Sequence, residues 1–326
     1  MIRKELSEIS QPIKSEIENF NEIFKQSMRS KVGLVDLVAK YLLRQKGKKI
    51  RPLLVLLSAK VAGGINERTY RGAVLVELLH TATLVHDDVV DNADKRRGVW
   101  SINRAFKNKV AVLMGDYLLS RGLMIAVEGK DYDFLGVITN AVKRMSEGEL
   151  LQIQKTRKLN IDEDTYFKVI SDKTASLLET CCLIGALSAS DDEKYQNAMK
   201  QFGMSIGMAF QIQDDILDFE GTSSLIGKPV GGDIKEKKIT LPLIYSLSKV
   251  SSNEANEIKK IIKDGKDKTK IKKVIDFVRK NDGINYAVRT AQSFSGQAKE
   301  ALKVFPDSPA KLALEALVEF VVERKN

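Results

Sequence analysis

The chain has 326 residues, of which 43% are hydrophobic and 29% charged, and this composition excludes a largely disordered protein. Its two cysteines, Cys181 and Cys182, are adjacent, which excludes a disulfide scaffold and does not fit metal-site spacing, so we expect a reducing, cytoplasmic compartment. The net charge of +10 favours anionic partners such as phosphorylated small molecules, nucleic acid or an anionic membrane surface.

The distribution of proline predicts helices throughout the chain. Residues 53–228 contain no proline, and helix interiors exclude it. Apolar residues such as Val74, Leu75 and Leu78 recur at the spacing of one helix face. The expected helices are at about 7–27, 31–46, 50–62, 67–92, 100–106, 108–128, 132–155, 162–186, 191–219, 238–248, 253–263, 268–280, 282–303 and 308–324. Because no Pro/Ser-rich linker divides the sequence, it predicts one all-α domain over residues 1–326.

We expect no membrane span in this sequence. Uninterrupted apolar runs such as Leu53–Leu57 and Cys181–Leu187 are far shorter than the roughly 20 residues that a spanning helix needs. The first residues include Glu5 and Glu8 and no apolar core, unlike a signal peptide. The lysine-rich run 259–273 is typical of a solvated surface. Without a nucleic-acid-binding signature or stacking aromatics, we expect no nucleic-acid partner.

Two aspartate motifs of the form DDxxD carry the strongest chemical signal. The first is Asp87, Asp88 and Asp91, and the second repeats this spacing 127 residues later, at Asp214, Asp215 and Asp218. Carboxylates four residues apart lie side by side on a helix and repel each other unless a cation compensates. Oxygen ligands of this kind suit Mg²⁺, which keeps waters and completes its shell with phosphate oxygens. Both motifs end long apolar helices, so they predict two metal-bearing walls of one cavity.

Cationic residues near these motifs predict a diphosphate ligand. Arginine grips diphosphates bidentately, and lysine acts as a point charge. Lys173 is notable because the part of its predicted helix that follows it is rich in leucine, alanine and cysteine. The candidate cations are Lys48, Arg51, Arg96, Arg97, Lys173 and Lys228.

Nucleotide-binding and hydrolytic signatures are missing. The sequence contains neither a P-loop nor a GxGxxG following a strand. Its two histidines, His80 and His86, are too few and too close to the first motif to indicate a hydrolytic triad. We expect His86 to pack beside the site and His80 to reach the same cavity.

These motifs together resemble the trans-isoprenyl diphosphate synthases, also called polyprenyl synthetases. They occur in the family's order and spacing, and one small departure is Lys46, where many members have a second glycine. The matching segments are GKKIRP (47–52), LLHTATLVHDDVVDNADKRRG (78–98), GD (115–116), EGELLQ (147–152), DKTA (172–175), FQIQDDILD (210–218), GKPVGGD (227–233) and KKITLP (237–242).

The resemblance implies an all-α bundle around a deep cavity, a homodimer, and peripheral contact with a membrane for product release. It implies condensation of an allylic diphosphate with isopentenyl diphosphate, using three Mg²⁺ ions with substrate bound. The implied metal ligands are Asp87, Asp91, Asp214 and Asp218. The implied ligands of the allylic diphosphate are Arg96, Lys173 and Lys228, and those of isopentenyl diphosphate are Lys48, Arg51, His80 and Arg97. Thr174 and Gln211 would line the reacting carbons.

Three residues before the first motif bear on product length. The allylic chain must grow away from Asp87 along its helix, and Thr83 and Ala82 lie one turn deeper. Family members that make short products commonly carry an aromatic residue at these positions. Both residues are small in this sequence, so we expect the floor of the product channel to lie deeper, at Leu79 or beyond. The product should then be roughly C30–C40, as in synthases that supply quinone side chains.

Other readings of the same motifs remain open. A short-chain farnesyl or geranylgeranyl diphosphate synthase fits if another bulky residue caps the channel early. A class I terpene cyclase also uses an Asp-rich helix and Mg²⁺, but it would lack the isopentenyl diphosphate site. A non-catalytic subunit of a heteromeric synthase would have lost aspartates, and none is lost here.

Overall fold

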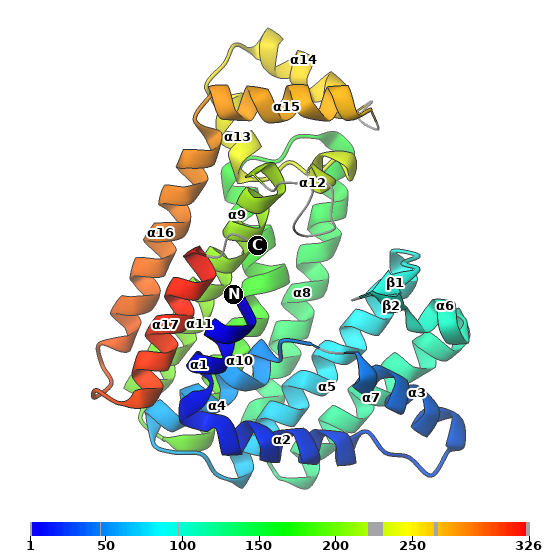
Figure 1. Ribbon diagram of the computed structural model, residues 1–326, viewed down its shortest axis with the longest axis vertical. Coiled ribbons are helices and arrows are strands. Elements are labelled where there is room, and N and C mark those ends of the chain that lie inside the picture. Colours follow the sequence, from blue (N-terminus) through cyan, green and yellow to red (C-terminus); the bar gives the residue numbers. More distant parts are fainter. Residues whose placement is uncertain (1, 46, 97, 221–230, 264–266, 324–326) are drawn as a thin grey trace.

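The protein is almost entirely helical, which confirms the all-α fold class (Figure 1). This computed structural model describes residues 2–45, 47–96, 98–220, 231–263 and 267–323. The helices of the first half are α1 (Ile2–Ile9), η1 (Gln11–Ile13), α2 (Lys14–Ser27), α3 (Gly33–Arg44), α4 (Ile50–Ala62), α5 (Glu67–Val90), α6 (Ile102–Phe106), α7 (Asn108–Glu128) and α8 (Tyr132–Lys158). Those of the second half are α9 (Glu163–Ile170), η2 (Ser171–Ala175), α10 (Ser176–Ala189), α11 (Glu193–Glu220), α12 (Gly232–Lys235), α13 (Leu241–Ser248), α14 (Ser252–Lys263), α15 (Lys268–Lys280), α16 (Gly283–Leu302) and α17 (Pro309–Glu323).

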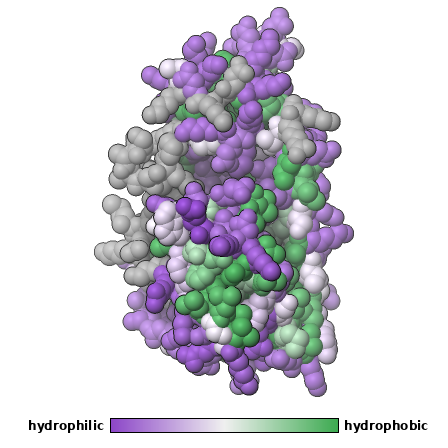
Figure 2. All heavy atoms as spheres, turned by 90° about the vertical axis from the view of Figure 1, so that its right-hand side faces the viewer, coloured by the Kyte–Doolittle hydropathy of each residue, from purple (hydrophilic) through white to green (hydrophobic). Residues whose placement is uncertain are grey.

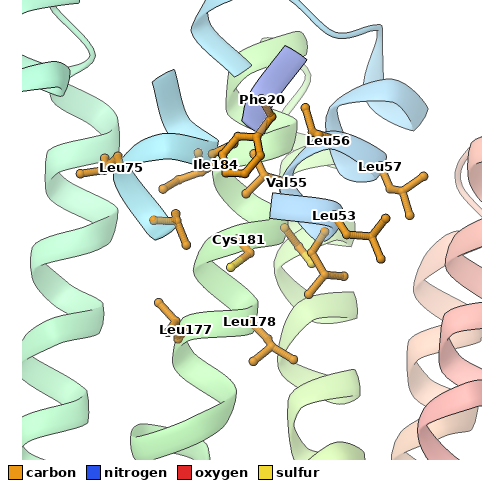
Figure 3. Close-up of a cluster of buried hydrophobic side chains, with 14 of the residues drawn as sticks. Phe20, Leu53, Val55, Leu56, Leu57, Leu75, Leu177, Leu178, Cys181 and Ile184 are labelled. Carbon is orange, nitrogen blue, oxygen red and sulfur yellow. The ribbon is translucent and has the colours of Figure 1, made fainter. Parts of the chain in front are cut away.

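The core of the lower half of the molecule in Figure 1 is formed by α4, α5 and α10. Phe20 of α2 lies over the side chains of α4, and Leu177, Cys181 and Ile184 of α10 face them (Figure 3). Leu54 of α4 is fully buried, and burying a leucine contributes about 2 kcal/mol. This apolar packing holds α5, which carries the first aspartate motif, against its neighbours.

A second apolar cluster lies around the other end of α11, with α13, α15 and α16. Phe219 near the end of α11 is buried there, and Phe294 of α16 packs against both clusters. The long helices α11 and α16 pack along each other and so link the two clusters. The expectation of one domain over residues 1–326 remains a prediction.

Four local features differ from the helices expected from sequence. The predicted helix 7–27 divides at η1, where Pro12 removes a backbone donor. A two-stranded antiparallel hairpin, β1 (Lys95–Arg96) and β2 (Val99–Trp100), was not expected. The predicted helix 162–186 contains a π-helical turn, η2, between α9 and α10. The predicted helix 238–248 begins at Leu241, after a separate short helix, α12. The periodic spacing of apolar residues continues across these interruptions of the helices, so the spacing alone does not predict them.

Helix α7 departs from the expectation of no membrane span. Among the residues that the structure describes, it is the one helix long and apolar enough to cross a membrane, judged by length and composition alone. Its few charged residues, such as Asp116 and Arg121, interrupt the apolar runs, so that no uninterrupted run in this helix is long enough to predict a membrane span. The helix packs against α5, α6 and α8, and 33% of its apolar stretch is buried. The core helices of soluble proteins can meet the same criteria of length and composition.

Candidate active site

The first aspartate motif lies at the carboxyl end of α5. Asp87 is in the last turn, and Asp91 follows the helix directly, with its backbone N–H donating to the Asp87 carbonyl at 2.8 Å. Asp88 points inward and is 2% exposed. Its Oδ1 accepts a hydrogen bond from Arg96 Nε at 2.7 Å and forms an ion pair with Arg96 Nη2 at the same distance. The middle carboxylate is therefore buried and holds Arg96, while Asp87 and Asp91 are exposed.

The surroundings of Asp87 favour a cation. The residue is exposed, yet protein atoms surround part of its carboxylate. This partial burial raises the pKa of Asp87, and the charges of Asp91 and Glu149 raise it further. Lys173 and Arg96 lower the pKa without cancelling the increase. The negative charge is thus incompletely balanced by protein groups, which is the condition that a divalent cation relieves.

A glycine on α7 allows the end of α5 that carries this motif to pack closely against α7. A Cβ atom at Gly115 would lie 2.2 Å from His86 Nε2, so only glycine leaves room for that ring. His86 Nε2 lies 3.2 Å from the Val112 carbonyl and 3.4 Å from Asp116 Oδ1. The expectation that His86 packs beside the site agrees with this geometry. The GD motif of the sequence therefore fixes the residue that precedes Asp87.

The second aspartate motif lies in the last turns of α11. Asp215 is buried, and its carboxylate accepts hydrogen bonds from Tyr166 Oη at 2.6 Å and Gln211 Nε2 at 2.9 Å. Burial, helped by the charge of Asp233, raises the pKa of Asp215 to about 7. Asp214, half-buried on the same helix, is one turn from Asp218. As in the first motif, the middle aspartate turns inward.

Asp218 has a structural role in addition to the metal role predicted for it. Its two carboxylate oxygens accept hydrogen bonds from the backbone N–H groups of Gly232, at 2.9 Å, and Asp233, at 3.1 Å. These bonds hold the start of α12 against α11. Each carboxylate oxygen has a second lone pair, so the bonds still leave acceptor capacity for a metal or its water.

The π-helical turn η2 brings Lys173 and Thr174 to the same region. Lys173 Nζ donates to Gln152 Oε1 of α8 at 3.0 Å and pairs with Glu149 of that helix. Thr174 Oγ1 donates to Gln211 Oε1 of α11 at 2.9 Å. The three residues predicted to act on the allylic substrate, Lys173, Thr174 and Gln211, are thus brought together by η2 and α11.

Two cavities lie at the two motifs. A narrow one of about 80 Å³, beside the first motif, is lined by Gly47, Lys49, Glu77, His80, Asp88 and Arg96, among others. The other, of about 140 Å³, lies beside the second motif and is lined by Gln152, Tyr166, Lys173, Thr174, Gln211, Asp215, Asp233 and Lys238, among others. The two-wall interpretation expects a single cavity, whereas these two cavities share no lining residue among those that the structure describes, so the interpretation remains a prediction.

The predicted substrate-binding residues do not all meet in these cavities. His80 and Arg96 line the first cavity together, although the resemblance assigns them to different substrates. Lys48 is exposed just before α4, and Arg51 is half-buried within that helix. Arg97 and Lys228 lie outside the residues that the structure describes. The assigned roles of these side chains remain predictions.

The predicted chain-length residues lie on α5, beneath Asp87. Ala82 and Leu79 are 2% and 1% exposed, and Thr83 Oγ1 donates to the His80 carbonyl at 2.8 Å. Helices α5 and α7 run antiparallel here: His86 contacts Gly115, and a Cβ at Gly122 would lie 3.5 Å from Leu78 Cβ. Between these two contacts, Ala82 is expected opposite Leu118 of α7.

Several residues of the site had no role in the sequence prediction. Lys238 lines the second cavity; burial alone would lower its pKa, but Glu236 and Asp233 outweigh this and raise it. Lys49 lines the first cavity, where burial lowers its pKa. The motifs KKITLP, GKKIRP and EGELLQ already contained signals for Lys238, Lys49 and Glu149. Tyr166 had no such signal, because it lies 49 residues from its partner Asp215.

The carboxylates fit a metal that is completed by other ligands. Within the described ranges, no group of three His, Cys, Asp or Glu side chains closes around a single point. Two-carboxylate walls such as Asp87 with Asp91 are what Mg²⁺ uses when water and substrate phosphate supply the remaining oxygens. The donors present therefore fit Mg²⁺ bound with a diphosphate.

The polyprenyl synthetase family model matches residues 33–278 of this chain. The chain is 31% identical to the octaprenyl diphosphate synthase of Haemophilus influenzae, over 98% of this chain and 97% of that protein. A polyprenyl synthase from Caulobacter crescentus, crystallised with calcium and isoprenyl diphosphate, superposes with a TM-score of 0.89 at 30% identity, covering 98% of each chain. The geranylgeranyl pyrophosphate synthetase of Pyrococcus horikoshii gives 0.88 at 32% identity, covering 98% of this chain and 99% of that one.

Proposed function

The chain belongs to the polyprenyl synthetase family and is a prenyltransferase, and from this we propose that it makes a long all-trans polyprenyl diphosphate, of hexaprenyl to octaprenyl length, for quinone side chains. The substrates are an allylic diphosphate and isopentenyl diphosphate. The observation that carries the assignment is the pair of aspartate motifs, at the ends of α5 and α11, with Lys173 close to both.

The reaction starts with cleavage of the carbon–oxygen bond of the allylic diphosphate. The electron pair goes to the departing diphosphate, and Lys173, Arg96 and Lys228 hold that negative charge. Mg²⁺, held by Asp87 and Asp91 on one wall and by Asp214 and Asp218 on the other, supplies further charge neutralisation when bound. By the family resemblance, three Mg²⁺ ions would be bound together with substrate.

The second step joins the two substrates. The hydroxyl and amide dipoles of Thr174 and Gln211, hydrogen-bonded to each other, face the allylic cation and help to exclude water. Lys48, Arg51, His80 and Arg97 hold isopentenyl diphosphate so that its double bond attacks the cation. Formation of the new carbon–carbon bond leaves a carbocation on the former isopentenyl group. This carbocation loses a proton to the departed diphosphate, so that atoms and charge balance.

Small side chains under Asp87 support a long product. Ala82 and Thr83 are smaller than the aromatic residue that short-chain members commonly carry there, so we expect the growing chain to reach Leu79 or deeper. The alternative within the family is a short-chain product, since the relatives include a geranylgeranyl synthetase as well as an octaprenyl synthase. A terpene cyclase is disfavoured by the first cavity, whose lining of His80 and Lys49 suits a second diphosphate.

A homodimer would cover an apolar surface of this protein. Apolar side chains gather in the lower part of the face in Figure 2, on the side of the molecule where Figure 1 has α3 and α7. Leu113 of α7 and Leu37 of α3 are 58% and 54% exposed. Burying such side chains against a second copy is favourable by about 1.5–3 kcal/mol each. Light scattering of wild type and Leu113→Glu tests this, with the equally exposed Leu312→Glu on α17 as the control.

The function is tested by incubating the protein with Mg²⁺, farnesyl diphosphate and radiolabelled isopentenyl diphosphate. Label in a butanol-extractable product establishes chain elongation, and reversed-phase chromatography gives the product length. Label that remains entirely in the aqueous phase contradicts the assignment. We further propose a cytoplasmic location with peripheral membrane contact during product release, which fractionation of cells with and without carbonate washing tests.

A further inference from the structure

The turn that presents Lys173 is unusual in its backbone. η2 is π-helical from Ser171 to Ala175, between two regular α-helices. Single π-turns of this kind are rare and occur frequently at functional sites. This one turns Lys173 and Thr174 towards the site and leaves Asp172 on the opposite side, where it is 8% exposed. The position of Lys173 thus depends on what holds Asp172.

One guanidinium group spans the whole turn from outside. Arg144 of α8 donates through Nε to Asp172 Oδ1 at 2.9 Å and through Nη2 to Ser171 Oγ at 3.1 Å. Its Nη1 donates to Glu179 Oε2 at 2.8 Å, two turns further along. Arg144 therefore binds the first residues of η2 and the body of α10 at the same time. Lysine cannot do this, because its single ammonium lacks the planar fork.

The two acidic partners of Arg144 are buried, so their charges depend on it. Asp172 and Glu179 are 11% and 9% exposed in their side chains. Their other cations are peripheral: Lys168 is 68% exposed, and Lys200 reaches Glu179 at only 3.8 Å. Burial alone would raise the pKa of Asp172, but the hydrogen bonds from Arg144 and Lys168 outweigh it and lower the pKa.

The same face of α8 contacts both sides of the turn. Arg144, Gly148 and Gln152 are four residues apart and share one helix face. A Cβ at Gly148 would lie 3.1 Å from Asp172 Cβ and 3.1 Å from the Lys173 backbone nitrogen, so glycine permits this close approach. Gln152 accepts from Lys173 Nζ at 3.0 Å. A shift of η2 relative to α8 would therefore displace the lysine ammonium directly.

We propose that Arg144 is a positioning residue, which clamps η2 through Ser171, Asp172 and Glu179 so that Lys173 and Thr174 stay aimed at the allylic diphosphate. This inference rests on the proposed role of Lys173 in binding that diphosphate. Arg144 touches neither substrate; it acts on the reaction through the backbone of the turn. A displacement of about 1 Å at a reacting group can cost about a hundredfold in rate.

The test compares Arg144→Gln with wild type in single-condensation kinetics, with farnesyl diphosphate and isopentenyl diphosphate varied in turn. The expected result is a fall in kcat/KM for farnesyl diphosphate of about ten- to a hundredfold, with the KM for isopentenyl diphosphate within about twofold. Arg144→Lys should recover only part of the loss. If Arg144→Gln does not fold, Asp172→Asn, which keeps the pair between Arg144 and Glu179, takes its place with the same expected result.

A matched control separates positioning from general loss of stability. Arg71 of α5 makes an equivalent pair with buried Asp131, at 2.7 and 3.2 Å, and lies about 24 Å along α5 from Asp87. Arg71→Gln should lower the melting temperature and leave both kinetic constants unchanged. If Arg144→Gln behaves like Arg71→Gln, or weakens both substrates equally, the proposal is wrong.

A variant of Lys173 distinguishes failure of this inference from failure of the proposed function. If Lys173→Ala leaves kcat/KM for farnesyl diphosphate unchanged, the assigned role of Lys173 fails, whatever Arg144→Gln does. If Lys173→Ala is strongly impaired and Arg144→Gln is not, only the clamp is refuted. In the double variant Arg144→Gln/Lys173→Ala, the clamp predicts little further loss beyond Lys173→Ala, because the clamp acts through that lysine.

Discussion

Replacing Ala82 by phenylalanine should shorten the product. Ala82 lies five residues before Asp87, about 7.5 Å deeper along α5, and the helix continues about 22 Å further to Glu67. An isoprene unit contributes four bonds of about 1.5 Å, or roughly 4–5 Å in extended form. The helix beyond Ala82 thus has length for roughly four to five further units, and for two to three as far as Leu75. Phenylalanine should remove at least that smaller number and leave farnesyl to geranylgeranyl products.

The same substitution has a stability cost that must be measured separately. Ala82 is 2% exposed, so a ring there must push on its neighbours or enter the channel, and overpacking costs about 1–3 kcal/mol. Ala73 is also buried but lies nine residues away, on the opposite face of α5. Ala73→Phe is therefore the control: it should lower the melting temperature without changing product length.

The assay is reversed-phase chromatography of products made with excess isopentenyl diphosphate. Two outcomes refute the reasoning. If the wild-type protein stops at farnesyl or geranylgeranyl length, the long-chain assignment is wrong. If it makes long products that Ala82→Phe leaves unchanged, the channel runs along another face of α5.

Three further predictions concern metal, substrates and pH. Asp87→Ala or Asp214→Ala should lower turnover by about a thousandfold in Mg²⁺ with unchanged circular dichroism; near-normal activity would contradict the two-wall metal model. Lys48→Ala should mainly raise the KM for isopentenyl diphosphate, whereas Lys173→Ala should impair use of the allylic substrate, and a reversed pattern in steady-state kinetics would exchange the two assignments. Because the pKa of Asp215 is raised from 3.8 to about 7, its contribution to stability is complete below about pH 4 and is lost as the pH rises through about 7. In EDTA the melting temperature should therefore fall between about pH 4 and 7, and Asp215→Asn should flatten that fall; equal slopes would contradict it.

The sequence by itself determined the fold class, most helix positions and the family. The absence of proline over residues 53–228 and the spacing of apolar residues along each helix are local features, which a sequence displays directly. The family follows from several motifs that occur in a fixed order and at fixed spacing. The proximity of the carboxylates within each motif was also accessible, because side chains at i and i+4 share a helix face. Lys173, Thr174 and Gln211, each named from sequence, line one cavity in the structure, where Thr174 donates a hydrogen bond to Gln211.

Only the tertiary structure decided which aspartate of each motif is buried. Three aspartates within five residues have equivalent chemistry, and their spacing alone does not name the partner that each one finds. Asp88 pairs with Arg96 of β1, and Asp215 accepts a hydrogen bond from Tyr166, 49 residues away. The π-turn was equally hidden, because its register depends on contacts from another helix. Arg144 makes those contacts. Because Arg144 lies outside the DKTA motif, the residues of that motif do not indicate its role.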